Sequence, residues 1–143
     1  MISRTAEYAL RAVICLAHRK DQPLTTQQIA EMTQVPAGYL SKVLQALGRA
    51  DLVVSQRGLH GGFTLGRDPT EITVLDVINS VDPIRRIHTC PLGLKSHGKQ
   101  LCPLHQRLDD AMEMVERAFA ETTVAEVLAD PNKSRPLCEA HAR

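Results

Sequence analysis

Apolar residues recur at helical spacing from Ser3 to about His18 and predict a first helix with one buried face. Ser3 or Thr5 can cap the start of this helix, and Asp21-Gln22-Pro23 ends it. The buried face is expected to consist of Ala6, Ala9, Leu10, Val13, Ile14 and Ala17.

The next thirty residues carry the pattern of two short helices joined by a tight turn. Thr25 and Gln28 have the spacing of a capping box and open the first of these helices. Thr33-Gln-Val-Pro36 makes the connection, with Pro36 suited to the first turn of a second helix that runs to about Ala50. The second helix is expected to bury Leu40, Val43, Leu44 and Leu47 and to expose Ser41, Lys42, Gln45 and Arg49. This arrangement is typical of a helix-turn-helix.

Two short β-prone runs follow, Leu52–Ser55 and Phe63–Leu65, separated by the glycine-rich stretch Gln56–Gly62. A β-hairpin directly after the second helix is a wing, and Arg57 at its tip can enter a DNA minor groove. Glycines 58, 61 and 62 permit positive φ angles and a close approach of the backbone to phosphates. The alternative is a solvated hairpin with one ordinary surface arginine.

Two further helical segments and a short terminal helix are predicted after the hairpin. Ile72–Val81 is amphipathic, with Thr73 and Asp76 at capping-box spacing. A long helix begins near Pro103, and a last short helix covers Val124 to about Ala129. The long helix has an apolar stripe at heptad spacing that packs on its own domain or pairs with a second copy of the chain. The stripe consists of Leu104, Leu108, Ala111, Val115 and Ala118, widened by Met112 and Phe119.

These elements predict a mainly α fold with a small β-hairpin wing. Residues 1–82 form a winged helix-turn-helix DNA-binding domain and residues 83–103 a cysteine-containing sensor loop. Residues 104–130 form the dimerisation helix and the short terminal helix, and residues 131–143 a flexible tail.

Composition and charge fit this organisation. At 143 residues, with 3% aromatic residues and no tryptophan, the chain is expected to form one small domain with an aliphatic core. It has no apolar run long enough for a membrane span and no signal-peptide pattern, so we expect a cytoplasmic protein whose four cysteines are not structural disulfides. Residues 1–67 carry eight Lys or Arg against four Asp or Glu, a balance that suits a polyanionic partner.

Enzyme and carrier functions fit the sequence poorly. There is no nucleotide-binding glycine motif, no Cys-x-x-Cys pair and no nucleophile–base constellation. An iron–sulfur carrier or redox protein using the loop from Cys90 to His105 is the remaining alternative, and it leaves the wing unexplained. Cys15 is expected to be a core residue, and Cys138 lies in the tail with no evident partner.

Over nearly its whole length the chain resembles the family of dimeric bacterial repressors that includes IscR, NsrR and RirA. The most family-specific segment is the wing, Ser55-Gln-Arg-Gly-Leu-His-Gly-Gly-Phe-Thr-Leu65. Other matching segments are Tyr8-Ala-Leu-Arg11, Ile29-Ala30, Tyr39-Leu40, Leu44–Leu47, Asp76-Val-Ile78 and the cysteine loop.

The resemblance implies DNA binding by the second helix of the pair and by the wing. It assigns Ser41 and Lys42 to the major groove and Arg57 to the minor groove of a roughly palindromic operator. Tyr39, Gln45, Gly58 and His60 complete the set of expected DNA contacts. The partners are therefore double-stranded DNA and a second copy of the chain, with no membrane.

The resemblance also implies an iron–sulfur cluster in the loop. Members of the family bind such a cluster through three loop cysteines and a fourth ligand, which is a loop histidine or an acidic residue from the partner's first helix. Here Cys90 and Cys102 occupy the outer positions, Ser96 replaces the middle cysteine, and His105 matches the loop histidine. The implied ligands of a [2Fe–2S] centre are Cys90, Cys102, His105 and Glu7, and the signal is redox state, nitric oxide or iron–sulfur status.

The loop residues leave other interpretations open. Cys102 precedes Pro103 at a helix start, where the helix dipole favours thiolate, and this suits either ligation or a reversible Cys90–Cys102 disulfide. Zinc bound with His97 or His105 and a purely structural loop are further alternatives. Glu7 falls in the first turn of its helix, where a carboxylate is favourable without any ligand role.

Overall fold

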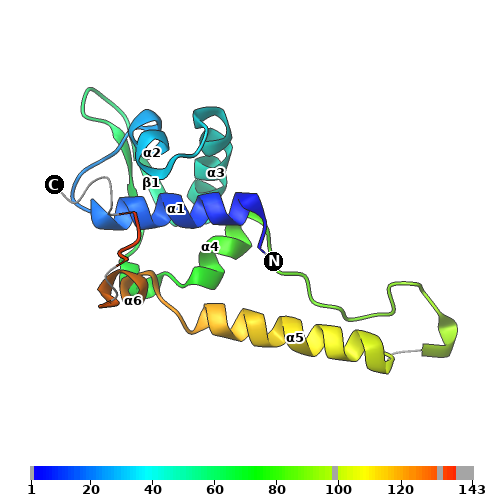
Figure 1. The fold of residues 1–143 in the computed structure, drawn as a ribbon. Coiled ribbons are helices and arrows are strands. Elements are labelled where there is room, and N and C mark those ends of the chain that lie inside the picture. The colour runs from blue at the N-terminus through cyan, green and yellow to red at the C-terminus, as the bar shows by residue number, and fades with distance from the viewer. Residues whose placement is uncertain (1, 98–99, 132–133, 138–143) are drawn as a thin grey trace.

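A computed structural model of the chain describes residues 2–97, 100–131 and 134–137. The long first helix, α1 (Arg4–His18), runs through the middle of the molecule. Helices α2 (Thr26–Thr33) and α3 (Ala37–Arg49) and the hairpin lie on one side of α1, and α4 (Val74–Val81), α5 (Pro103–Ala120) and α6 (Val124–Ala129) lie on the other (Figure 1).

Three helices begin at the capping residues that were predicted from the sequence. The Ser3 hydroxyl caps α1 by accepting the backbone N–H of Ala6 at 3.1 Å. Thr25 and Gln28 form a complete capping box at the start of α2, and Thr73 and Asp76 form one at α4. These local bonds satisfy N–H groups that an uncapped helix leaves without partners, and this is why the predicted and observed starts agree.

The hairpin pairs β1 (Val53–Gln56) with β2 (Gly62–Leu65) in antiparallel register, from Val53 opposite Leu65 to Gln56 opposite Gly62. Leu24, just before α2, adds one bridge on the other side of β2 through two backbone hydrogen bonds with Phe63, of 3.0 and 2.7 Å. The hairpin is thereby attached to the start of the helix-turn-helix as well as to the end of α3.

The core of the body is aliphatic, as the low aromatic content predicted. One face of α1 and one face of α3 supply most of it, and side chains from α2, β1, α4 and α6 complete it. Cys15 of α1 is buried there, and burial raises the pKa of its thiol to about 11. The largest fully buried side chains are Leu16, Ile29, Leu40, Leu44, Leu47, Leu52, Ile72 and Ile78.

Helix α5 extends away from this body and packs against α4. The segment that follows α4 runs outward, includes a short 3₁₀ turn at Lys95–His97, and returns into α5 (Figure 1). After α5, Thr122 and Val124 hydrogen-bond to the backbone at the start of α4, which brings α6 back to the body.

The last described residues lie beside α1. Leu137 packs against the core, and the carbonyl oxygen of Pro136 lies 2.8 Å from the Nε2 atom of His18. Cys138, expected in a tail without a partner, lies outside the described residues. In the described ranges no helix is long and apolar enough to cross a membrane.

Candidate nucleic-acid interface and cysteine loop

The outer face of α3 is exposed where the sequence predicted contacts. Tyr39, Ser41, Lys42 and Gln45 are all exposed, and Leu40, Val43, Leu44 and Leu47 anchor the opposite face of the helix in the core. The Ser41 hydroxyl donates to the carbonyl of Ala37 at 3.2 Å, and α3 carries Arg49 in its last turn. This face therefore offers hydroxyl, amide and cationic groups on a rigid support.

Tyr39 is held by α1. Its ring meets the ring of Tyr8 edge-on, with centroids 5.2 Å apart and an interplanar angle of 87°, and its hydroxyl is hydrogen-bonded to Thr5. Edge-to-face aromatic pairs of this kind are favourable beyond simple burial. The start of α3 is thus fixed to α1 by an aromatic contact that the sequence analysis did not anticipate.

The wing loop places Arg57, Gly58 and His60 at its exposed end. A turn closed by a 3.0 Å hydrogen bond from the Gly61 N–H to the Gly58 carbonyl forms the apex, so Arg57 stands just before the apex rather than at it. Gly58 and Gly62 have φ +112° and +152°, conformations that favour glycine, as predicted for these residues. Gly61, for which the same was expected, does not take a positive φ.

The base of the wing is packed too tightly for side chains at two glycines. A Cβ atom on Gly62, which has φ +152°, would lie 2.6 Å from the carbonyl oxygen of Leu24. A Cβ atom on Gly66 would lie 2.5 Å from the carbonyl oxygen of Asp51. Arg67 adds a 3.1 Å hydrogen bond from Nη2 to the carbonyl of Ala50, just after α3. These contacts fix the orientation of the wing relative to α3.

In the cysteine loop, Cys102 and His105 lie together at the start of α5. Cys102 is the N-cap residue, Pro103 is the first helical residue, and Sγ of Cys102 is 3.3 Å from Nδ1 of His105. A thiol and an imidazole this close form a pair of donors suited to a soft metal ion.

Cys90 lies at the other end of the loop and is half buried. The backbone N–H of Leu94, with smaller contributions from those of Leu92 and Gly93, lowers the pKa of the Cys90 thiol below its usual value, although partial burial opposes this. Backbone N–H groups that converge on a sulfur stabilise thiolate, the form that ligates metals and reacts with oxidants.

A complete metal site is not assembled within the described part of one chain. No three His, Cys, Asp or Glu side chains gather there in a way that could hold a metal ion. Of the four implied ligands, the described part of the chain brings only Cys102 and His105 within contact distance of each other.

Glu7, the fourth implied ligand, is on α1 and has another partner. Its Oε1 accepts a 3.1 Å hydrogen bond from Nε of Arg11, one turn along the helix. Arg11 also donates from Nη1 to the carbonyl of Thr33 at 3.2 Å and lies over the ring of Tyr8 at 5.5 Å. The i, i+4 spacing of Glu7 and Arg11 was a signal for this pair that the sequence analysis did not use.

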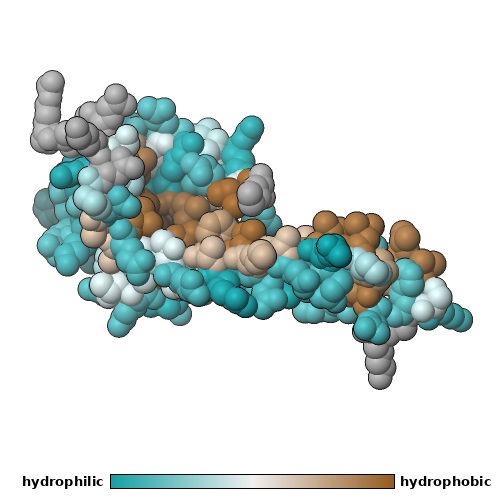
Figure 2. Space-filling model, turned by 60° about the horizontal axis from the view of Figure 1, so that its bottom comes forward, coloured by the Kyte–Doolittle hydropathy of each residue, from teal (hydrophilic) through white to brown (hydrophobic). Residues whose placement is uncertain are grey.

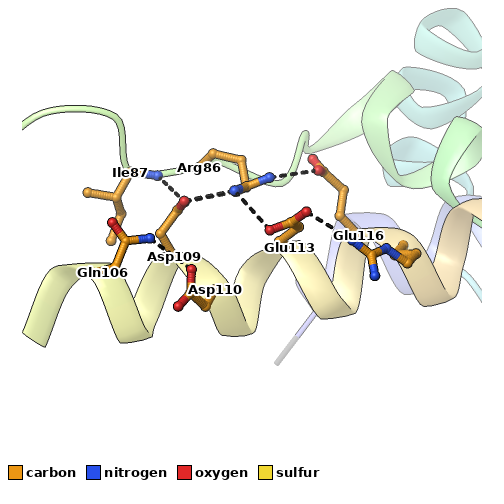
Figure 3. Close-up of polar contacts among 8 residues, drawn as sticks. Arg86, Ile87, Gln106, Asp109, Asp110, Glu113 and Glu116 are labelled. Atoms are coloured by element: carbon orange, nitrogen blue, oxygen red, sulfur yellow. Dashed lines mark hydrogen bonds and ion pairs between the residues drawn. The ribbon is translucent and has the colours of Figure 1, made fainter. Parts of the chain in front are cut away.

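A network of ion pairs connects the outgoing segment to α5 (Figure 3). Arg86 binds Asp109 through two parallel hydrogen bonds of 2.8 and 2.7 Å, and Asp109 also accepts the backbone N–H of Ile87 at 2.8 Å. Glu113 and Glu116 lie 3.8 and 3.4 Å from the same guanidinium group. The hydrogen bonds that Asp109 accepts, first from Arg86 and then from the backbone N–H of Ile87, lower its pKa to about 2. Sequence reasoning missed this network because its partners are far apart in the chain.

An apolar groove of about 490 Å³ lies between part of α5 and the body. The predicted stripe of α5 forms one wall, and the start of α1, α4 and residues 82–85 form the other. In Figure 2 apolar surface follows this groove and continues toward the far end of α5. The α5 wall consists of Leu108, Ala111, Met112, Val115 and Phe119.

Known proteins resemble this chain over most of its length. It is 29% identical over 132 residues to the HTH-type transcriptional regulator IscR of Photobacterium profundum, covering 92% of this chain and 77% of that protein. It is 30% identical over 155 residues to an rrf2-like HTH-type regulator of Rhodobacter capsulatus, covering 97% and 99% of the two chains.

Solved structures share the fold. IscR of T. potens superposes with a TM-score of 0.78 at 24% identity, covering 94% of this chain and 90% of that one. CymR, the global cysteine regulator of B. subtilis, superposes with a TM-score of 0.73 at 26% identity, covering 89% and 95%. The winged helix-turn-helix with a long C-terminal helix is therefore confirmed.

A family model described as Rrf2, iron-dependent transcriptional regulator, matches residues 2–130. That span takes in the helix-turn-helix, the wing, the cysteine loop and α5. The family consists of transcriptional regulators and not of enzymes, which agrees with the absence of catalytic motifs in the sequence. The chain belongs to the Rrf2 family of DNA-binding transcriptional regulators.

Proposed function

We propose that this protein is a cytoplasmic, homodimeric transcriptional repressor that binds a roughly palindromic operator and responds to the state of its cysteine loop. The observation that carries the proposal is the shared orientation of α3 and the wing. Both lie on the same side of α1, with the polar face of α3 and the Arg57 loop exposed (Figure 1).

In the proposed complex α3 enters the major groove of DNA. Ser41, Lys42 and Gln45 offer donors and acceptors to base edges and phosphates, and Tyr39 contacts the backbone beside them. The wing enters the adjacent minor groove with Arg57, supported by Gly58 and His60. The tight packing of Gly62 against Leu24 and of Gly66 against Asp51 supports this assignment, because it attaches the base of the wing to the segments on either side of the helix-turn-helix.

The dimer is proposed to form through α5 of each subunit. The only buried residue of α5 among those described is Asp109, and Leu104 and Leu108 of the apolar stripe are 62% and 45% exposed. A monomer would leave this stripe and the groove beside it in water, at a cost of about 25 cal/mol per Å² of apolar surface. A second α5 covers the stripe, and the twofold axis it creates predicts a palindromic operator.

The loop is proposed to hold a [2Fe–2S] cluster in the dimer, with Cys90, Cys102 and His105 from one subunit and Glu7 from its partner. The close pair of Cys102 and His105 at the start of α5 supports this set. When bound, such a cluster would supply a redox-active centre. Recruitment of Glu7 requires it to leave Arg11, which itself contacts Tyr8 and the end of α2.

A thiol switch without a cluster is the second candidate, and the lowered pKa of Cys90 favours it. In this case Cys90 and Cys102 would form a reversible disulfide that reshapes the loop between its two ends. Zinc bound by Cys102 and His105 would be a third way to use the same donors.

In vitro selection from a random pool of duplexes tests the DNA-binding proposal. We expect the full-length protein to enrich a motif with twofold symmetry and to bind it as two chains per duplex by analytical ultracentrifugation. Leu108→Glu, which puts a charge in the apolar groove, should yield monomers, whereas Arg107→Glu on the exposed side of α5 should remain dimeric. An asymmetric motif bound by one chain would contradict the proposal.

A further inference from the structure

Leu59 is 95% exposed, more than any other large apolar side chain in the described residues. Single exposed leucines are common on protein surfaces and need no explanation by themselves. This one differs in its position, because it stands at the apex of the wing, between Gly58 and His60.

The turn that carries Leu59 is fixed by its backbone. Leu59 and His60 are its two central residues, closed by the hydrogen bond between Gly61 and Gly58. Gly58, the first residue of the turn, has a φ of +112°, and a Cβ atom on Gly61 would lie 2.4 Å from the carbonyl oxygen of Gln56. The exposure of Leu59 therefore reflects a defined turn geometry that presents an apolar side chain outward.

The neighbours of Leu59 suit a groove with an anionic rim and an apolar interior. Arg57 and His60, both exposed, stand on either side of it. The minor groove of DNA has phosphates at its rims, while its walls are the sugar rings. At A·T pairs its floor lacks the exocyclic amino group that guanine presents there. Proteins that bind this groove often place leucine or another apolar side chain against base steps.

We propose that Leu59 is a specificity-determining DNA contact, packed on the floor of the minor groove at base pairs that lack the guanine amino group. The inference rests on the proposed placement of the wing in that groove. Arg57 supplies electrostatic attraction to the groove. Leu59, two residues further toward the apex, distinguishes base pairs that lack the guanine amino group from those that carry it on the groove floor. An amino group under Leu59 would stay buried without a hydrogen-bond partner, because the side chain offers none.

The test uses a duplex selected from the random pool by the wild-type protein. At each base pair beneath the wing the minor-groove amino group is added by replacing adenine with 2,6-diaminopurine, or removed by replacing guanine with inosine. Neither replacement changes the major-groove edge. We expect the wild type to bind the amino-free duplex about tenfold more tightly at one or two positions, a ratio in the range set by burial of one leucine side chain.

Leu59→Ala should lose this preference at those positions and bind the amino-free duplex about tenfold more weakly, with an unchanged salt dependence because no phosphate contact is removed. Val54→Ala is the matched control, since Val54 is a 49% exposed apolar residue on β1 of the same hairpin, away from the apex. It should retain both affinity and preference. Circular dichroism checks that each variant is folded.

The outcomes separate this inference from the proposed function. If the wild type selects a duplex and Leu59→Ala keeps the same affinity and the same amino-group preference, the inference is wrong while DNA binding stands. If the wild type selects no duplex, the proposed function fails, and the inference fails with it.

Discussion

Arg86 and Asp109 form a bidentate ion pair that fixes the entry of the cysteine loop to α5, the helix into which the loop returns. Asp109 is 6% exposed and also accepts the N–H of Ile87. Cys102 is the N-cap of the same helix, so both ends of the loop are attached to α5. A change in the separation of Cys90 and Cys102 would therefore act on α5 and on the groove beside it.

Asp109→Asn should destabilise the protein in a pH-dependent way. The pKa of Asp109 is lowered to about 2, so its carboxylate stabilises the folded state fully above the unfolded value of about 3.9. That contribution is lost as the pH falls from about 4 toward 2. The urea midpoint of the variant should be lower than that of the wild type at pH 7, and the difference should shrink between pH 5 and pH 3.

Asp110→Asn is the control for this measurement. Asp110 is an exposed neighbour on α5 that accepts one hydrogen bond from Gln106 at 2.8 Å. Its replacement should change stability by less than about 0.5 kcal/mol, as is usual for surface positions. Equal effects of the two substitutions, or a difference that does not depend on pH, would show that the Arg86 pair does not stabilise the fold.

Gly62→Ala should weaken the wing. The added methyl group would meet the backbone of Leu24 at 2.6 Å and demands a φ of +152° from alanine, so we expect a loss of about 1–3 kcal/mol in chemical denaturation. Gly38→Ala, on α3 with open space around its Cβ position, should be neutral or stabilising by up to about 1 kcal/mol. A neutral Gly62→Ala would mean that the bridge between Leu24 and Phe63 does not hold the hairpin.

Protein purified without oxygen should be coloured and contain iron. Cys90→Ala and Cys102→Ala should each lose the colour, and Cys15→Ala should keep it, because Cys15 is buried in the core. Ultraviolet–visible absorption with metal analysis measures both properties. Colourless protein without stoichiometric iron would remove the cluster from the account and leave the thiol switch, to be tested by mass spectrometry of the Cys90–Cys102 pair after oxidation.

The parts of the fold set by local chemistry were predictable from the sequence. The capping boxes at Thr25 and Thr73 determine helix starts through residues three positions apart, and Gly58 and Gly62 of the wing are favoured by their own positive φ angles. The apolar spacing of α3 likewise determines which face is exposed. Each of these signals lies within one short segment of the chain.

Contacts between distant segments were not predictable in this way. Arg86 and Asp109, or Tyr8 and Tyr39, carry no sequence pattern that pairs them. The position of Leu59 at the apex of the wing depends on which two residues form the hydrogen bond that closes the turn. Because Gly61 and Gly62 are adjacent, more than one such pair was compatible with the sequence. The ligand set that we propose for the loop would involve a second copy of the chain, and no pattern within one chain determines how two copies meet.

The most direct test of the central claim is the affinity of Arg57→Ala for the selected duplex, measured by fluorescence anisotropy at fixed salt. We expect a loss of about 1–3 kcal/mol, roughly 5- to 150-fold, with circular dichroism and any bound iron unchanged. Arg107→Ala removes an equal charge from α5, away from α3 and the wing, and should bind like the wild type. Wild-type affinity in Arg57→Ala would contradict the account of how this protein reads DNA.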